Sequence, residues 1–195
     1  MTDSPGYRQL GMMPQGHPLR GEPEPTTQLD FDAVYDSEFG FVWNSLKRLG
    51  IHEGDLEDLT HEVFMRAYRS RSEYDPHRPL RPWLFGVAFR AASTFRRSAR
   101  QRREVVSDLG EFRGEPLATE DPADAAANRR LVLKSLEALD LKKRAVFVLH
   151  ELNGYSAPEI AEVLGEPLNT VYSRLRVAWK QFEAEVRKIR GKDDV

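Results

Sequence analysis

Apolar residues recur every three or four positions along most of this chain, which is the spacing of an α-helix that buries one face. One such run covers residues 30–49, a second begins near Asp55, and a third opens at Pro82. The third run loses its period in the arginine-rich stretch 96–103, where we expect the helix to dissolve. This pattern predicts an all-helical first domain over residues 29–103.

Two segments of the chain have no apolar period. Residues 1–28 are rich in proline and glycine, which predicts a disordered tail. Residues 104–121 are acidic and contain further glycines and a proline, which predicts a flexible linker. Helical spacing returns in residues 122–195, the predicted second domain. The predicted fold class is therefore all-α, with two small helical domains joined by a flexible acidic linker.

A sharp break divides one stretch of the second domain, GYSAPEIAEVLGEPLNTVYSRLRVAWKQF, into two short predicted helices. Ser156 and Glu159 have the spacing of a capping box at the start of the first helix. Gly165 is placed to end that helix in a left-handed conformation, and Pro167 is placed to start the next. So tight a turn predicts a helix-turn-helix, although an ordinary helical hairpin has the same local pattern. The polar face of the second helix carries side chains suited to phosphates and base edges: Asn169, Thr170, Tyr172, Ser173, Arg174 and Arg176.

The net charge of −2 conceals a strong segregation of charge along the chain. Residues 29–65 hold two basic and nine acidic side chains, whereas residues 66–103 hold eleven basic and two acidic ones. Residues 104–124 hold one basic and seven acidic side chains, and residues 125–195 hold thirteen basic and ten acidic ones. A polyanion such as DNA would be attracted to the second and fourth of these segments. We expect the acidic linker between them to fold back and to weaken DNA binding by the free chain.

The composition excludes several classes of function. The chain has no cysteine, which excludes a disulfide scaffold and a thiolate metal site. No apolar run approaches the roughly 18 residues that span a bilayer, and no secretory signal is recognisable at the N-terminus. Two His-Glu pairs, at His61 and His150, have half of a zinc-protease motif, but neither is followed by the second histidine. We therefore expect a cytoplasmic protein that is not an enzyme and has no cofactor, no metal and no stable membrane insertion.

Three motifs in a fixed order make the interpretation specific. They are DLEDLTHEVFMRAYR, YDPHRPLRPWLFGVAFR and ALDLKKRAVFVLHELNGYSAPEIAEVLGEPLNTVYSRLR. With these motifs the chain resembles, over about residues 30–187, the extracytoplasmic-function (ECF) class of bacterial sigma factors, which keep only regions 2 and 4 of the larger sigma factors. The resemblance implies that region 2 lies in residues 29–103 and region 4 in residues 122–195. It also implies three partners: core RNA polymerase (its β and β′ subunits), promoter DNA, and an anti-sigma factor.

The resemblance further implies roles for particular residues. The region 2 helix that docks on the β′ subunit would use Asp58, His61, Glu62 and Met65. The promoter −10 element would be read by Tyr74, His77, Arg78, Arg81, Arg90, Arg96, Arg97 and Arg100. At the −35 element, the base-facing residues would be Tyr172, Ser173 and Arg176, and the phosphate-facing residues Asn169, Thr170 and Arg174. His61, Arg90 and Tyr172 stand where the family commonly has other residue types, so the family's promoter preferences are not carried over.

Two other functions are compatible with parts of the sequence. A self-sufficient helix-turn-helix repressor or activator would need a sensing domain or a dimerisation helix, whereas the first domain carries a basic helix and an acidic face. A small hydrolase or nuclease would need a metal or nucleophile cluster, and we find no such cluster in the sequence. The order of the motifs therefore favours a sigma factor.

Overall fold

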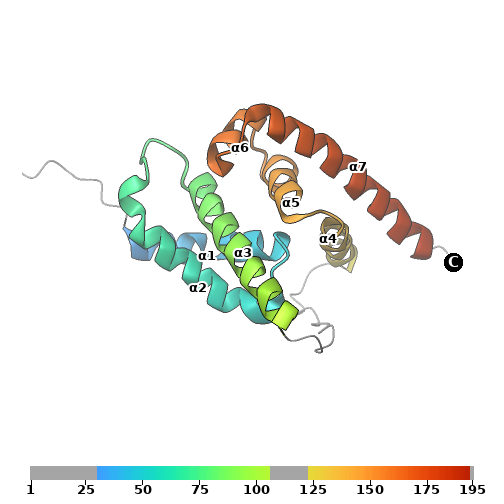
Figure 1. Cartoon of the computed structure of the whole chain (residues 1–195), viewed down its shortest axis with the longest axis horizontal. Helices are drawn as coiled ribbons and strands as arrows, with labels where there is room; N and C mark the ends of the chain where they lie inside the picture. Colours follow the sequence, from blue (N-terminus) through green and yellow to red (C-terminus); the bar gives the residue numbers. More distant parts are fainter. Residues whose placement is uncertain (1–29, 106–122, 194–195) are drawn as a thin grey trace, which may run out of the picture.

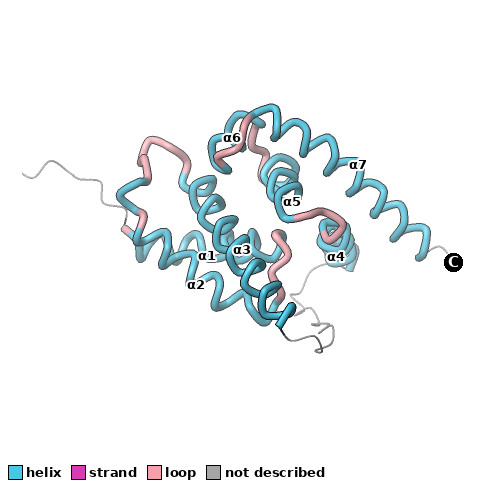
Figure 2. The backbone as a smooth tube through the Cα atoms, in the orientation of Figure 1, coloured by secondary structure: helices cyan, strands magenta, loops and turns pink. Residues whose placement is uncertain are grey.

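The computed structural model describes residues 30–105 and 123–193, so the predictions for residues 1–28 and for most of the linker 104–121 lie outside the described residues. Within the described ranges the only regular secondary structure is helix, with loops between the helices, which confirms the all-α fold class (Figure 1 and Figure 2). The helices are α1 (Phe31–Arg48), α2 (Glu53–Arg69), α3 (Leu80–Val105), α4 (Ala123–Leu136), α5 (Leu141–Phe147), α6 (Ala157–Leu164) and α7 (Leu168–Asp193). A 3₁₀ turn (Arg71–Glu73) follows α2, and a π-helical segment (Val148–Leu152) follows α5.

Helices α1, α2 and α3 pack against one another and form the N-terminal half of the molecule (Figure 1). The carboxylate of Asp30 accepts a hydrogen bond from the backbone N–H of Ala33 at 3.3 Å and so caps the start of α1. The turn after α1 contains Gly50, whose φ of 84° is favourable only for glycine. The apolar positions that predicted these helices are buried between them: Val42, Leu46, Leu56, Val63, Leu84 and Val87.

Helix α3 differs from the prediction at both ends. It begins at Leu80 rather than at Pro82, and it continues through the arginine-rich stretch to Val105, so the predicted loss of helix at residues 96–103 is wrong. Arginine is a strong helix former, and it needs no buried partner to stay helical. The apolar period fades there because Arg96 and Arg97 are exposed, beyond the part of α3 that packs in the core.

Helices α4, α5 and α6 all pack on α7 and form the C-terminal half (Figure 1). Helix α5 begins at Leu141, where the carboxylate of Asp140 accepts a hydrogen bond from the backbone N–H of Lys143 at 2.9 Å. The second helix of the predicted helix-turn-helix does start at Leu168, but it is not short, since it continues to Asp193. Its far part packs on α4, which explains why the helix is long.

The two halves are in direct contact. Helix α3 of the N-terminal half packs against α6 of the C-terminal half, and buried residues of both halves belong to one hydrophobic core (Figure 1). The periodicity of the sequence did not predict this contact, because it reports only which face of a helix is buried and not what covers it. The contact decides which of the predicted site residues come together.

Candidate nucleic-acid interface

The turn between α6 and α7 is held by local bonds and by one acidic side chain. The predicted capping box is present at the start of α6, where Glu159 accepts hydrogen bonds from the backbone N–H (2.7 Å) and the hydroxyl (2.6 Å) of Ser156. Gly165 ends α6 in the left-handed conformation, with φ 64° and ψ 35°, as its position predicted. Glu166 then forms ion pairs with Arg174 (2.9 Å) and Lys142 (3.6 Å). The start of α7 is therefore fixed relative to α5 and α6.

The first turns of α7 present a polar face on one side and a buried face on the other. Val171, Leu175 and Ala178 are buried against the other helices of the half. On the opposite side, most of the predicted −35 residues are exposed: Asn169, Tyr172, Ser173 and Arg176. Tyr172 is 54% exposed, which is unusual for so large a ring and leaves it free to contact a ligand.

Two predicted −35 residues do not belong to this exposed set. Thr170 is half-buried, and its carbonyl accepts a hydrogen bond from the Ser173 hydroxyl at 2.9 Å. The side chain of Arg174 is only 18% exposed and lies against Glu166. The pKa of the Glu166 carboxyl is lowered mainly by the hydrogen bond from the Arg174 guanidinium, and Lys142 lowers it further. In this structure Arg174 holds the turn and does not face solvent with Arg176.

The acidic face of α2 is exposed as predicted, but it has aromatic neighbours that the sequence pattern did not indicate. Asp58, His61 and Met65 are exposed, and Glu62 forms an ion pair with Arg66 at 2.7 Å. The ring of His61 stacks on Tyr35 of α1, and its Nδ1 lies 3.3 Å from the Tyr35 hydroxyl. This face therefore combines carboxylates with exposed apolar surface, a composition suited to a protein partner.

One aromatic residue beside this face was missed. Tyr68 lies one turn beyond the face along α2, is 46% exposed, and packs edge-on against Phe31 with ring centroids 5.2 Å apart. The guanidinium of Arg71 lies 4.1 Å from the centroid of the Tyr68 ring. Tyr68 follows Met65 by three positions, which places the two side chains on the same side of the helix. This spacing was the signal in the sequence that could have added Tyr68 to the face.

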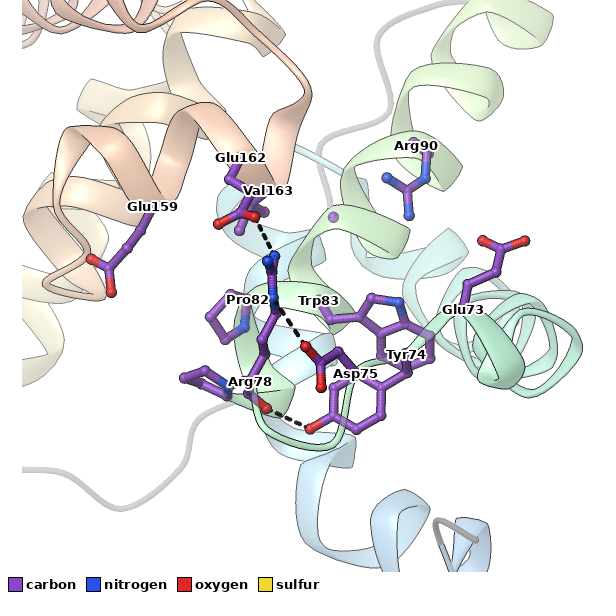
Figure 3. A pocket seen from close by; sticks show the side chains of 12 residues that line it. Glu73, Tyr74, Asp75, Arg78, Pro82, Trp83, Arg90, Glu159, Glu162 and Val163 are labelled. Atoms are coloured by element: carbon purple, nitrogen blue, oxygen red, sulfur yellow. Dashed lines mark hydrogen bonds and ion pairs between the residues drawn. The ribbon is translucent and has the colours of Figure 1, made fainter. Parts of the chain in front are cut away.

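The loop between α2 and α3 is closed by its own side chains. The Tyr74 hydroxyl donates a hydrogen bond to the carbonyl of Arg78 at 2.7 Å, and the Tyr74 ring lies 5.0 Å from Trp83 (Figure 3). Burial and the nearby Asp75 raise the pKa of the Tyr74 phenol, so it stays a neutral hydrogen-bond donor. Arg78 forms one ion pair with Asp75 at 3.4 Å and a second with Glu162 of α6.

The predicted −10 residues fall into three groups in the structure. Tyr74, Arg78 and Arg90 line one cavity of about 640 Å³ between the loop, α3 and α6 (Figure 3). Arg81 does not line this cavity but contacts α1, where it forms an ion pair with Glu38 at 2.9 Å and lies over the Phe41 ring. The remaining residues lie outside the cavity lining: His77 is exposed in the loop, Arg96 and Arg97 are exposed further along α3, and the side chain of Arg100 lies outside the described residues.

Neither His-Glu pair contributes to a metal site. Within residues 30–105 and 123–193 no group of three or more His, Cys, Asp or Glu side chains is arranged to hold a metal ion. In the second pair, Nδ1 of His150 lies 2.6 Å from Glu151, and the same carboxylate accepts a hydrogen bond from the Trp179 indole at 2.9 Å. No helix in the described ranges is both long and apolar enough to cross a membrane.

Comparisons with known proteins agree with this arrangement. The family models for sigma-70 region 2 and sigma-70 region 4 match residues 34–103 and 129–181. The ECF RNA polymerase sigma factor SigL of Mycobacterium tuberculosis is 32% identical over 158 residues, which are 80% of this chain and 89% of SigL. The RNA polymerase sigma factor CnrH of Cupriavidus metallidurans is 32% identical over 148 residues, which are 71% of this chain and 76% of CnrH.

Solved structures of sigma factors have the same fold. CnrH in complex with the cytosolic domain of CnrY aligns with a TM-score of 0.58 at 25% identity, over 81% of this chain and 88% of that one. The sigma factor RpoE of Bartonella quintana, in complex with the anti-sigma factor NepR, aligns with a TM-score of 0.63 at 20% identity, over 81% of this chain and 97% of that one. The chain thus belongs to the ECF RNA polymerase sigma factors and contains sigma-70 regions 2 and 4. It is an alternative sigma factor, which directs RNA polymerase to promoters.

Proposed function

We propose that this sigma factor reads the −35 element with the exposed face at the start of α7. The observation that carries this proposal is the solvent-facing set of Tyr172, Ser173 and Arg176 on a helix whose entry is fixed by Gly165. A helix held in this way can enter the major groove with its N-terminal side chains toward the base edges. Asn169 and Thr170 lie at the very start of the helix, where side chains reach phosphates. Arg174 acts through Glu166, because its guanidinium is already engaged by that carboxylate.

The −10 element is read, in this proposal, by the loop after α2 and the adjoining face of α3. Arg78 and Arg90 provide cations on either side of the paired rings of Tyr74 and Trp83 (Figure 3). Cations attract the phosphate backbone, and an aromatic ring can stack on an unpaired base. Exposed residues outside the cavity, His77, Arg96 and Arg97, extend the same basic surface. Arg81 is a poorer candidate, because its guanidinium is bound to Glu38.

Core polymerase would dock on the α2 face that contains Asp58, His61, Glu62 and Met65. The support for this assignment is the combination of exposed carboxylates with exposed apolar side chains on one helix face. Charged groups of this kind steer association with a basic partner, and the apolar ones contribute burial once the surfaces meet. We further propose that the protein acts in the bacterial cytoplasm, where promoters and polymerase are, and that an anti-sigma factor regulates it, as NepR is in complex with the RpoE of Bartonella quintana.

Run-off transcription tests the proposal directly. The full-length chain, core polymerase and a library of promoter fragments would be incubated together, and the transcribed fragments would be sequenced to define the −10 and −35 elements. Arg176→Ala should change the base preference at one −35 position, whereas the matched variant Arg187→Ala, exposed at the other end of α7, should not. An unchanged −35 preference with Arg176→Ala would contradict the assignment of α7.

A further inference from the structure

We infer that Leu168 and Tyr172 form an apolar pair that selects thymine in the −35 element by contact with the C5 methyl groups of the bases. The inference rests on the proposed entry of α7 into the major groove at the −35 element. The residues that the sequence assigned to this element are all polar or aromatic and do not include Leu168. Three features of the structure support the pair: the exposure of both side chains, their alignment with Arg176, and the rigid turn that precedes them.

Leu168 and Tyr172 leave large apolar side chains in contact with solvent. Leu168 has the helical spacing of Val171 and Leu175, which are both buried, and yet it is 39% exposed. Tyr172, four positions further on, is 54% exposed. Neither Leu168 nor Tyr172 belongs to the hydrophobic core. One exposed leucine is ordinary in a folded protein, but two large apolar side chains together on a proposed DNA-binding face indicate a binding surface.

Tyr172 differs from the other exposed aromatic residues of the described ranges, because those already have partners within the protein. Tyr68 packs on the ring of Phe31, and the indole N–H of Trp179 donates a hydrogen bond to Glu151 at 2.9 Å. Within residues 30–105 and 123–193 no hydrogen bond, ion pair or ring contact involves Tyr172. Its ring is therefore available for a contact with a ligand.

Leu168, Tyr172 and Arg176 form one exposed ridge along the first turns of α7, since they follow one another at intervals of four residues. Each interval advances about 6 Å along the helix axis. Bases of one DNA strand are stacked about 3.4 Å apart, so an interval corresponds to at most about two base steps. A recognition helix brings its N-terminal side chains to the base edges. The ridge can therefore face neighbouring base pairs, with the apolar pair at one end and the cation at the other.

The turn before α7 fixes the start of this ridge. The backbone N–H groups of Thr170 and Val171 both donate hydrogen bonds to the carbonyl of Pro167, at 2.8 and 3.1 Å. The ion pair between Glu166 and Arg174 joins the turn to the second turn of the helix. A side chain that is already held in place loses little conformational freedom on binding. Even a contact with a single methyl group can therefore change the affinity measurably.

The chemistry of the major groove identifies the group that the apolar pair contacts. The C5 methyl group of thymine is the apolar group that base pairs present there, whereas the other groups at the base edges donate or accept hydrogen bonds. Leucine can bind only the methyl group, and a tyrosine ring can pack on it. Burial of one methyl group corresponds to about a four-fold gain in affinity. The thymine that Leu168 contacts should lie further from the base read by Arg176 than the thymine that Tyr172 contacts.

The experiment removes methyl groups from the DNA one at a time. Holoenzyme is formed from core polymerase and the full-length chain, and the promoter selected by run-off transcription carries deoxyuridine in place of single thymines of the −35 element. Deoxyuridine pairs as thymine does and lacks only the methyl group. Competition binding gives the ratio of the two Kd values for wild type, Leu168→Ala, Tyr172→Ala and Tyr172→Phe. Leu152→Ala is the matched control, because this leucine is 37% exposed but lies outside α7.

We expect deoxyuridine to weaken binding of the wild type about four-fold at two −35 positions. Leu168→Ala should abolish the difference at one position and Tyr172→Ala at the other, while Tyr172→Phe and Leu152→Ala keep both. A change in stability or in polymerase binding does not move this ratio, because it compares two fragments with the same protein. Equal binding of both fragments at every position, a −35 element without thymine, a difference that neither alanine variant removes, or its loss in Tyr172→Phe would overturn the inference.

A failure of the −35 assignment itself gives a different result. If Arg176→Ala changes the −35 preference and deoxyuridine has no effect, α7 reads the element and only the apolar pair is wrong. If neither Arg176→Ala nor deoxyuridine changes binding at any −35 position, the assignment of α7 to this element has failed, and the inference fails with it.

Discussion

Two arginines near the start of α7, Arg174 and Arg176, are two positions apart and have different surroundings. Arg176 is exposed beside Tyr172 and Ser173, whereas Arg174 is mostly covered and lies 2.9 Å from Glu166. Because both residues are arginine, the difference in their surroundings comes only from the direction in which each side chain leaves the helix. Their substitutions should therefore act on different properties of the protein.

We predict that Arg176→Ala relaxes specificity at one −35 position and lowers promoter discrimination by about 1–3 kcal/mol. The physical reason is the loss of a bidentate contact to a base edge. Competition binding of holoenzyme to the selected promoter and to fragments changed at single −35 positions measures the effect. An equal loss on all fragments would indicate a phosphate contact instead.

Arg174→Ala should act on stability, in a manner that depends on pH. Because Arg174 lowers the pKa of Glu166 in the folded protein, the ionised pair stabilises the fold above the ordinary glutamate pKa of 4.5, and this contribution is lost as the pH falls through the lowered value. The difference in melting temperature between wild type and Arg174→Ala should thus be present at pH 7 and shrink progressively below pH 4.5. Arg176→Ala is the control, since no such dependence is expected for an exposed arginine. A difference that is constant over this range would contradict the role of the pair.

At the scale of the element, α2 illustrates how one helix can serve packing and binding at once. Leu56, Val63 and Ala67 are buried against α1 and α3, while Asp58 and Met65 point outward from the same turns. The helical period separates the two sets, so a change on the outer face should leave the packing intact. The aromatic stacking of His61 on Tyr35 keeps part of the outer face rigid.

We predict that Asp58→Arg weakens binding of core polymerase at least several-fold and leaves the melting temperature within about 2 °C of wild type. The exposed position explains why the fold is insensitive, and like charge against a basic partner explains the loss of binding. Native gel shift with core polymerase measures the first quantity, and circular dichroism the second. Glu183→Arg, the same kind of charge change at an exposed site on α7, should leave polymerase binding unchanged. Normal polymerase binding by Asp58→Arg would show that the docking face lies elsewhere.

At the scale of the whole molecule, the contact between the halves links residues that are distant in the sequence. Gly50 and Gly154 both have positive φ, 84° and 76°, so alanine is strained at either position. They differ in their surroundings, because a side chain at Gly50 would collide with Arg144, whereas one at Gly154 meets nothing within 4 Å. Comparing alanine substitutions at Gly50 and Gly154 therefore distinguishes the effect of backbone strain from the effect of the contact between the halves.

We predict that Gly154→Ala destabilises the protein by about 1 kcal/mol and that Gly50→Ala destabilises it by about 1–3 kcal/mol more. Adding Arg144→Met to Gly50→Ala should recover much of the additional loss, since the shorter, uncharged side chain can move aside. Urea unfolding of the four full-length proteins gives the free energies. Equal effects of the two glycine substitutions would argue against a close contact between α5 and the end of α1.

Much of the fold was predictable because its signals are local. The apolar period located every long helix, and the cap at Ser156 and the glycine at position 165 located the turn. These signals depend on residues at most four positions apart, whose contacts form in almost any tertiary context. The C-terminal ends of α3 and α7 were predicted too early. The exposed part of a helix beyond the core needs no apolar stripe of its own, so the sequence pattern does not show it.

The sequence by itself determined the all-α class, the helix-turn-helix and the family, because each rests on local spacing and on the order of short motifs. Tertiary structure alone decided that Arg174 holds Glu166, that Arg81 is bound to Glu38, and that Glu162 of α6 lies on Arg78. Arg78 and Glu162 are 84 positions apart, and nothing in the pattern around either residue specifies the other. Such pairs form only when two packed faces meet, and which faces meet depends on the shape of the whole molecule rather than on any local period.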